Sequence, residues 1–278
     1  MLIKTVLLPV HVDQAEGDIV KALELCRAMG SHLSVLVISE APSVPLSSDP
    51  VVLSENWGVL AQKARQRLSK RVNDIKVLIA ESGNPASVRG ISVNEDLLGD
   101  AIAQQALYSD LVIVLRGFLT GLDVAKTIVA SIISTTGKPI LIANSSQLDA
   151  LDARKVVIAW DGEKPASRAI SEALPILKNA EMVEILLVDP IAGQTEEDKT
   201  MGGELETYLT RHGINNSVKA VSSEGKDVAD AIKQRAQQAD FDFIVMGAYT
   251  HSRFRQKFFG GTTTIMVKNC ETPVLMAH

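Results

Sequence analysis

Residues 243–268 read FIVMGAYTHSRFRQKFFGGTTTIMVK, and the order of the patterns within this stretch predicts its local structure. An apolar run (243–246) is followed by a long basic loop, a Gly-Gly pair and a helical pattern (264–268). This order predicts a strand, a loop and the start of a helix. Free backbone N–H groups at a helix start, together with the helix dipole, favour a bound anion such as phosphate. The stretch is therefore the first candidate for a ligand site.

The same alternation of strand and helix signals extends along the whole chain. Apolar, β-branched runs predict strands buried on both faces, and amphipathic stripes predict the helices between them. In the first half we expect strands at 3–8, 32–38, 75–79, 111–115 and 139–143, helices at 18–29, 55–72, 95–108 and 124–135, and loops at 39–54 and 81–92. After a polar linker at 144–152, the second half should have strands at 155–160, 183–188, 218–221, 243–246 and 273–277 and helices at 165–177, 196–211, 228–238 and 262–268.

The two halves also repeat each other in sequence. Asp110 precedes the run LVIV as Asp242 precedes the run FIVM, and each half ends in a proline and a short apolar strand. A repeated βαβαβαβαβ unit predicts two α/β domains in tandem, each an open, five-stranded parallel sheet flanked by helices. We place these domains at residues 1–146 and 153–278.

Composition narrows the classes of function. The net charge of −5 gives no support for nucleic-acid binding, because that function needs a basic face. No apolar run approaches the length that spans a bilayer, and the apolar N-terminus is too short for a signal peptide, so we expect a cytoplasmic protein. Cys26 and Cys270 have no partners at metal-like spacing. His11 and His251 lie at expected strand ends, where a metal is conceivable, but solvated histidines are more usual, and we assign no metal ligand.

Several short motifs lie at the ends of the expected strands of the second half. They are VIAWDG (157–162), LVD (187–189), GAY (247–249), GG (260–261) and TPVL (272–275). In these motifs and in the order of its elements, the chain resembles the universal stress protein family in its tandem two-domain form. The resemblance implies a Rossmann-like, adenine nucleotide alpha hydrolase-like fold and a role in stress response or sensing.

By this resemblance, the second half carries a nucleotide loop of altered sequence. Nucleotide-binding members have a glycine, two residues, a second glycine, nine residues, and then a glycine followed by Ser or Thr. Here Gly247 is the first glycine, Thr250 replaces the second, and Gly260 fits the third. Because Thr250 is β-branched and disfavours positive φ, two alternatives stay open: nucleotide binding, or a loop whose binding is weakened or lost.

The resemblance also implies the remaining ligand positions. Gly261 replaces the hydroxyl residue but keeps its N–H at the helix start, and Thr262 and Thr263 can supply hydroxyls. Asp161 and Val188 end two other strands, and open α/β sheets bind ligands beyond the carboxyl ends of their strands. The family places the position of Asp161 at the adenine or ribose end. The expected ligand is ATP or a related adenine nucleotide, with Mg²⁺.

The first half departs further from the family pattern. Gly117 and Gly121 lack the long spacing, and no Gly-Ser or Gly-Thr opens the following helix. We expect this domain not to bind ATP in the family's manner and to be structural. Family members pair through their last strands, so residues 139–143 and 273–277 should join the halves as an intramolecular pseudo-dimer. A further homodimer stays open.

The sequence supports three functional hypotheses. The first is an adenine-nucleotide-binding stress protein with at most slow ATP hydrolysis, because no residue is an obvious general base and none is assigned as catalytic. The second is an interaction scaffold that binds no nucleotide. The third is a hydrolase of the related adenine nucleotide class, which would need a Ser-Gly-Gly loop after a first strand. Residues 11–13 (HVD) and 161–163 (DGE) do not supply that loop.

Overall fold

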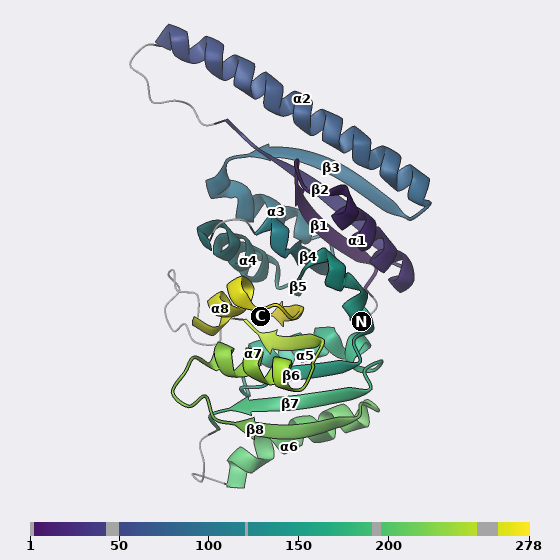
Figure 1. The fold of residues 1–278 in the computed structure, drawn as a ribbon, viewed down its shortest axis with the longest axis vertical. Helices are drawn as coiled ribbons and strands as arrows, with labels where there is room; N and C mark the ends of the chain where they lie inside the picture. Colours follow the sequence, from purple (N-terminus) through teal and green to yellow (C-terminus); the bar gives the residue numbers. More distant parts are fainter. Residues whose placement is uncertain (1–2, 43–49, 120–121, 191–195, 249–260) are drawn as a thin grey trace. The chain divides into compact units, whose positions relative to one another are not determined.

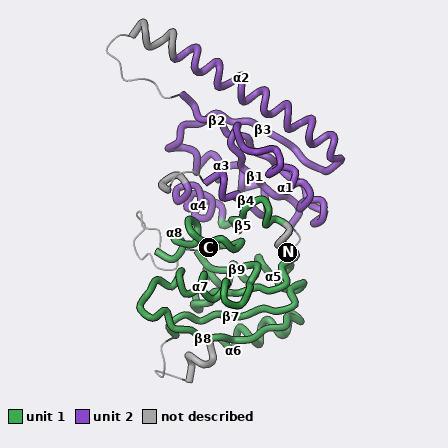
Figure 2. The backbone as a smooth tube through the Cα atoms, viewed as in Figure 1, with its two compact units in different colours: residues 1–2, 137–278 green, residues 3–136 purple. Residues whose placement is uncertain are grey.

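The computed structural model describes residues 3–42, 50–119, 122–190, 196–248 and 261–278. They form two compact units, which we call the N-terminal unit (Ile3–Thr136) and the C-terminal unit (Gly137–His278). Figure 2 colours the first purple and the second green. Each unit is an α/β structure in which helices flank a sheet.

The N-terminal unit is built on a parallel sheet in which four strands lie in the order β3-β2-β1-β4 (Figure 1). Its strands are β1 (Thr5–His11), β2 (His32–Glu40), β3 (Ala86–Val93) and β4 (Leu111–Leu115). Its helices are α1 (Glu16–Met29), α2 (Pro50–Ser82), η1 (Glu95–Leu97), α3 (Leu98–Ala106), η2 (Arg116–Phe118) and α4 (Leu122–Thr136). Strand β4 is buried along its whole length, as a continuous apolar run predicts.

The C-terminal unit has the strand order β5-β10-β9-β6-β7-β8, and the five strands from β10 to β8 are parallel. Its strands are β5 (Ile140–Ala143), β6 (Lys155–Ala159), β7 (Met182–Val188), β8 (Asn216–Val221), β9 (Phe243–Gly247) and β10 (Val274–Ala277). Its helices are η3 (Ser145–Asp152), α5 (Lys164–Leu177), α6 (Glu196–Arg211), α7 (Val228–Gln238) and α8 (Gly261–Asn269). The predicted α/β class with parallel sheets is therefore confirmed.

The last strands of the two sequence halves pair directly. Strand β5 runs antiparallel to β10, with Ile142 opposite Val274 and Ile140 opposite Met276. All four of these side chains are buried. The expected pairing of the last strands is thus confirmed, and β5 belongs to the C-terminal unit although it ends the first sequence repeat.

The structure corrects the sequence prediction for residues 75–92. We expected a strand at 75–79 and a loop at 81–92, but α2 continues to Ser82 and β3 follows it. The reason is packing: a Cβ atom on Gly90 of β3 would lie 2.8 Å from Val72 Cγ2 and 3.0 Å from Leu68 Cδ1 of α2. Glycine at position 90 of β3 therefore lets α2 pack closely against the strand. Ile75 lies on the same side of the helix as Leu68 and Val72 and is buried, so the helix continues through a segment rich in β-branched residues.

The polar segment after β5 is not the irregular linker that we expected. Its residues form the 3₁₀ helix η3. The Gln147 side chain accepts a hydrogen bond from the Asn144 N–H at 2.9 Å and donates one to the Glu271 carbonyl oxygen at 2.7 Å. Side-chain hydrogen bonds to the backbone therefore order this segment, and one of them reaches a distant part of the chain.

Both cysteines are expected to resist modification in the folded protein. Cys26 and Cys270 are buried and form no disulfide with described residues, and burial raises the pKa of the Cys26 thiol to about 12. Because the thiolate is the reactive form and an ordinary cysteine has a pKa of about 8.5, the thiolate fraction of Cys26 near pH 8 falls ~10³-fold. Maleimide labelling followed by mass spectrometry should modify both thiols only after unfolding in guanidinium. Rapid labelling of Cys26 in plain buffer would contradict its buried position in α1.

Candidate functional site

The first candidate site lies in the C-terminal unit, where the strand order reverses between β6 and β9. Ala159 of β6 is in register with Met246 of β9. Asp161 and Gly247 therefore follow this pair closely at the carboxyl ends of the two strands, and Val188 ends the neighbouring strand β7. The structure thus brings these three predicted positions to the edge at which open α/β sheets bind ligands.

Asp161 is exposed, and its carboxylate shapes the turn between β6 and α5. Its Oδ1 accepts a hydrogen bond from the Glu163 N–H at 3.0 Å. Within the described residues, Oδ2 has no partner. The residue is therefore a turn former that also has a carboxylate oxygen free to accept a bond from a hydroxyl.

Gly247 is required by packing rather than by its backbone angles. A Cβ atom at this position would lie 2.5 Å from the Ala166 nitrogen and 2.8 Å from the Pro165 carbonyl carbon. Both atoms belong to the first turn of α5, so neither can move without shifting the helix. Gly247 is also absent from the positive-φ residues of the described chain. Its role in the structure is to let α5 approach the end of β9.

The predicted anion cradle corresponds to the first turn of α8. This helix begins at Gly261, which is exposed, and a Cβ atom there would have nothing within 4 Å. Thr262 is half-buried and Thr263 is buried. Thr250 and Gly260 lie outside the described residues. The described part of the loop therefore supplies an accessible helix N-terminus with open space at its first residue.

Trp160 is a site residue that sequence reasoning missed. It lies between the end of β6 and Asp161, and its backbone N–H is bonded to the Leu186 carbonyl oxygen of β7 at 3.0 Å. The indole Nε1 is buried and has no hydrogen-bond partner among the described residues. A buried, unpaired N–H is costly, so this donor marks a place that a ligand acceptor can fill. The only sequence signal was an aromatic residue directly before the aspartate.

Asp189 links the end of β7 to the end of β8 through hydrogen bonds beside this site. Its Oδ1 accepts hydrogen bonds from the Ser223 N–H at 2.8 Å and from the Ser222 hydroxyl at 3.2 Å. Hydrogen bonds from Ser223, with a smaller contribution from Ser222, hold the pKa of the Asp189 carboxyl below its usual value. The residue adopts a φ of 48°, which aspartate tolerates better than most residues. Asp189 therefore shapes the edge, and its charged form is the stable one.

The equivalent position in the N-terminal unit is filled by an aromatic contact. Strands β1 and β4 are neighbours there, and His11 ends β1. The His11 ring stacks on Phe118 of η2 with centroids 4.5 Å apart, and its Nε2 lies 3.2 Å from the Phe118 carbonyl oxygen. Phe118 is buried. A buried ring thus stands directly after β4, in place of the glycine-rich loop of the family pattern.

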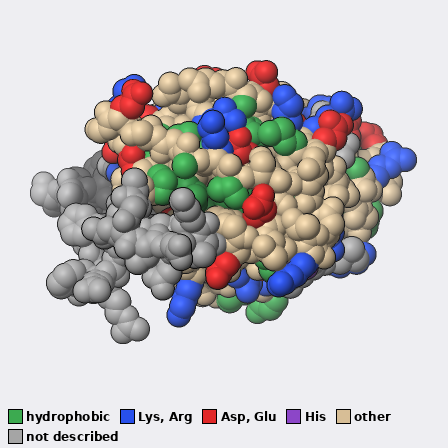
Figure 3. Space-filling view, turned by 90° about the horizontal axis from the view of Figure 1, so that it is seen from below, with side chains coloured by type: hydrophobic (Ala, Val, Ile, Leu, Met, Phe, Trp, Pro, Cys, Tyr) green, Lys and Arg blue, Asp and Glu red, His purple; other side chains and the backbone are tan. Residues whose placement is uncertain are grey.

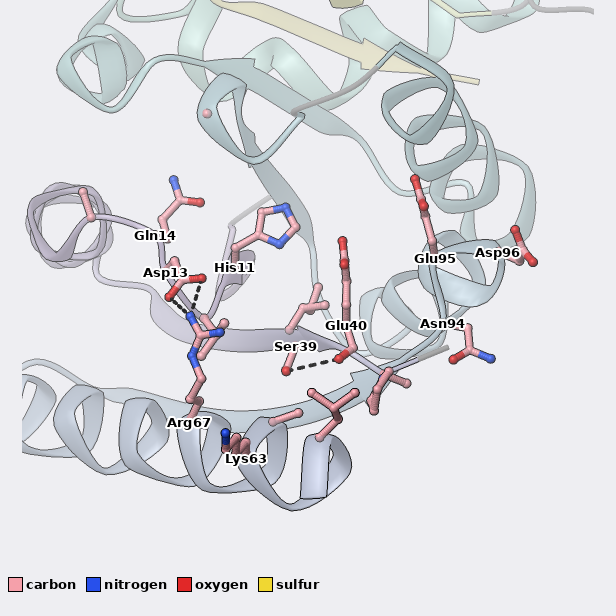
Figure 4. Close-up of a pocket in the computed structure, with 18 residues that line it drawn as sticks. His11, Asp13, Gln14, Ser39, Glu40, Lys63, Arg67, Asn94, Glu95 and Asp96 are labelled. Carbon is pink, nitrogen blue, oxygen red and sulfur yellow. Dashed lines mark hydrogen bonds and ion pairs between the residues drawn. The ribbon is translucent and has the colours of Figure 1, made fainter. Parts of the chain in front are cut away.

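Beside this contact, the N-terminal unit has a cavity of about 1260 Å³, which we call the N-terminal cavity. It opens at the carboxyl ends of β1, β2 and β3, and α2 and η1 form its walls (Figure 4). Its charged lining residues are Asp13, Glu40, Lys63, Arg67, Glu95 and Asp96. The sequence did not predict this cavity, because its lining residues come from segments that are far apart in the chain.

The described residues offer no metal centre: no group of three or more His, Cys, Asp or Glu side chains among them could hold an ion. Nor does any helix in this part of the chain combine the length and apolarity that crossing a membrane requires. On the face drawn in Figure 3, Lys and Arg side chains are interspersed with Asp and Glu rather than gathered into a basic patch. Such a face lacks the electrostatic footprint of a nucleic-acid surface.

Strand order and site together define the class of this protein. A parallel sheet with its candidate ligand positions at the carboxyl edge, beside a reversal of strand order, is a Rossmann-like α/β structure. The same arrangement of strands and helices occurs in both sequence halves.

The comparisons with known proteins show which proteins this chain is similar to. Residues 153–278 match the universal stress protein family. The whole chain is similar in fold to a universal stress protein from Archaeoglobus fulgidus DSM 4304, at 17% identity and a TM-score of 0.63, with 98% of this chain and 97% of that chain covered. A functionally unknown protein from Pseudomonas aeruginosa PAO1 is similar at 18% identity and a TM-score of 0.63, with 98% and 92% covered. The second half of the chain is thus similar to the universal stress protein family, and the chain as a whole shares its fold with these two proteins.

Two further results complete the comparisons. A universal stress protein family protein from Arabidopsis thaliana, solved with AMP bound, covers 43% of this chain and 88% of that chain at 19% identity and a TM-score of 0.32. Among curated proteins, none matches this sequence.

Proposed function

We propose that this protein binds ATP or a related adenine nucleotide at the carboxyl edge of the C-terminal unit and acts in stress response or sensing. The observation that carries this function is the register of β6 and β9, which brings Asp161 and Gly247 to one edge beside the reversal of strand order. Ligands of open α/β sheets bind in the crevice at such a reversal.

The residues at the carboxyl edge of this sheet offer suitable groups for the phosphates and the ribose of a nucleotide. The accessible N-terminus of α8 at Gly261 favours the phosphates, because its free N–H groups and the helix dipole both attract an anion. The free Oδ2 of Asp161 accepts a bond from a ribose hydroxyl, and the unpaired Trp160 Nε1 donates to a ligand acceptor. Mg²⁺ would arrive with the phosphates. We assign no general base, so hydrolysis is at most slow.

Isothermal titration calorimetry with ATP and Mg²⁺ tests this function. The intact chain should bind, and Gly261→Asp should weaken binding at least tenfold, because the added carboxylate stands where the phosphates approach. The matched control is Gly17→Asp, since Gly17 also lies in the first turn of a helix with nothing within 4 Å of its Cβ position. Aspartate is favourable at both helix starts, so both variants should fold.

The outcomes separate the competing hypotheses. Absence of binding to ATP and to AMP by the intact chain would overturn the nucleotide function and favour the scaffold. Unchanged binding in Gly261→Asp would contradict a site at the N-terminus of α8. A Thr250→Gly variant asks whether the altered loop residue limits affinity: tighter binding would identify Thr250 as the obstacle.

A further inference from the structure

Charges of opposite sign lie on different walls of the N-terminal cavity. The cations Lys63 and Arg67 come from α2, whereas Glu40 ends β2 and Glu95 and Asp96 belong to η1. Figure 4 shows the Glu40 and Glu95 side chains extending away from the two cations. The cavity therefore offers an acidic wall and a basic wall to a single ligand.

Among the described residues, one pair of these charges forms an ion pair, between Arg67 and Asp13. Arg67 Nη2 lies 2.6 Å from Asp13 Oδ1 and 2.8 Å from Oδ2. The remaining charged groups of the cavity have no ion pair or side-chain hydrogen bond within the described chain: Glu40, Lys63, Glu95 and Asp96. Three carboxylates and one ammonium group of the lining residues are thus without such a partner in the described part of the chain.

A buried polar group in the wall also lacks a good partner. Ser39 lines the cavity and is only 5% exposed. Its hydroxyl makes one long contact, 3.5 Å from the Glu40 carbonyl oxygen, which is well beyond the usual 2.5–3.0 Å range for such a bond. A buried hydroxyl without a close partner is unusual, and a polar atom of a ligand would satisfy it.

We propose that the N-terminal cavity binds a small ligand that carries one carboxylate and at least two cationic groups, the chemistry of a basic amino acid or a short basic peptide. The ligand carboxylate pairs with Lys63, and its ammonium and side-chain cation pair with Glu40, Glu95 and Asp96. Each charged group of the ligand then faces a wall of opposite charge, and this pairing both attracts the ligand and fixes its orientation. This site is separate from the nucleotide site, because all of its lining residues belong to the N-terminal unit.

Other ligand classes fit these walls less well. A nucleotide would bring several negative charges to a cavity with four carboxylates and two cations. A polyamine would leave Lys63 facing another cation, and a dicarboxylate would leave the acidic wall unpaired. The volume of about 1260 Å³ holds either the free amino acid or a short peptide, so the experiment must tell these two sources apart.

Calorimetry on the full chain at low ionic strength provides the test. The probes are L-arginine, the dipeptide Lys-Lys, agmatine, which is arginine without its carboxylate, and L-glutamate. Arginine or Lys-Lys should bind, and the tighter of the two identifies the source. Agmatine should bind about tenfold more weakly than arginine, and glutamate should not bind measurably, since each lacks part of the charge complement.

Two variants with matched controls locate the site. Glu40→Gln should weaken arginine binding about tenfold, and Lys63→Met should abolish the preference for arginine over agmatine. The controls are Asp74→Asn and Lys76→Met, because these exposed residues lie on α2 but do not line the cavity. Neither Glu40 nor Lys63 has a partner in the described chain, so both variants should keep the thermal midpoint of the intact protein.

Three results would overturn this assignment. The first is the absence of binding for both arginine and Lys-Lys at millimolar concentration. The second is agmatine binding as tight as arginine binding in the intact protein. The third is an equal loss of affinity in Glu40→Gln and in Asp74→Asn. None of these measurements involves ATP, so failure here leaves the nucleotide function standing, and failure of the nucleotide function leaves this site standing.

Discussion

Replacing Glu184 by alanine is expected to lower the free energy of unfolding by about 3 kcal/mol. Glu184 lies in β7 and is only 3% exposed. Its Oε1 accepts a hydrogen bond from Arg235 Nε at 2.7 Å, and its Oε2 accepts a second from Arg235 Nη2. Donation of these bonds to Glu184 raises the pKa of the Arg235 guanidinium. An arginine stays protonated in proteins even without such a partner, so the cation persists when Glu184 is removed. An uncompensated charge then remains between α7 and the sheet.

Urea unfolding followed by circular dichroism measures this effect. The matched control is Glu181→Ala, because Glu181 is exposed and its ion pair with Arg154 spans 3.7 Å between exposed side chains. Exposed pairs contribute little, so this variant should unfold close to the intact protein. The double variant Glu184→Gln/Arg235→Met should be more stable than Glu184→Ala, since it leaves no buried charge unpaired. Equal stability of Glu184→Ala and Glu181→Ala would contradict a buried bidentate pair.

The second large effect is expected for Gly247→Ala, which should destabilise the protein by about 1–3 kcal/mol. The new methyl group would lie 2.5 Å from the Ala166 nitrogen, and the backbone of α5 cannot yield as a flexible side chain would. Either α5 shifts away from β9 or β9 bends, and both movements alter the edge that carries Asp161. Weaker nucleotide binding should therefore accompany the loss of stability.

Comparing the thermal unfolding of Gly247→Ala with that of Gly203→Ala tests whether α5 and β9 need glycine at position 247. Gly203 lies within α6, and a Cβ atom there would have nothing within 4 Å. Alanine is preferred to glycine inside a helix, so Gly203→Ala should raise stability by about 0.5–1 kcal/mol. The same chemical change is thus expected to have opposite signs at the two positions. If the Gly247→Ala variant had the same stability as the intact protein, the packing of α5 would not need glycine at that position.

Much of the fold follows from sequence patterns that are local. The runs of β4 and β9 are apolar at every central position, which predicts buried parallel strands, and the repeat of these runs predicts two equivalent halves. The short strands after Pro139 and Pro273 were expected to pair, and β5 and β10 do pair. The positions of Asp161, Val188 and Gly247 at one edge follow from the same reasoning, because every parallel strand ends on the same side of its sheet.

The sequence failed where one residue's conformation depends on a distant neighbour. The segment 75–79 is rich in β-branched residues and resembles a strand, but it continues α2, whose Leu68 and Val72 pack against Gly90 of β3 and whose Ile75 is buried. The reason for glycine at 247 was also hidden, since α5 precedes that position by some eighty residues in the chain. Trp160 was readable only as an aromatic residue directly before Asp161, because the burial of its indole N–H depends on the folded surroundings.

By itself, then, the sequence determined the α/β class, the tandem repeat and the common edge at which the parallel strands end, whereas the pairing of the last strands was expected from the family resemblance. These features depend on apolar periodicity and chain order, which are readable residue by residue. Only the tertiary structure decided that Arg67 pairs with Asp13 while Glu40 and Lys63 are left unpaired around a cavity. Charge neutralisation depends on distances between residues far apart in the chain, and those distances exist only once α2 has packed on its sheet.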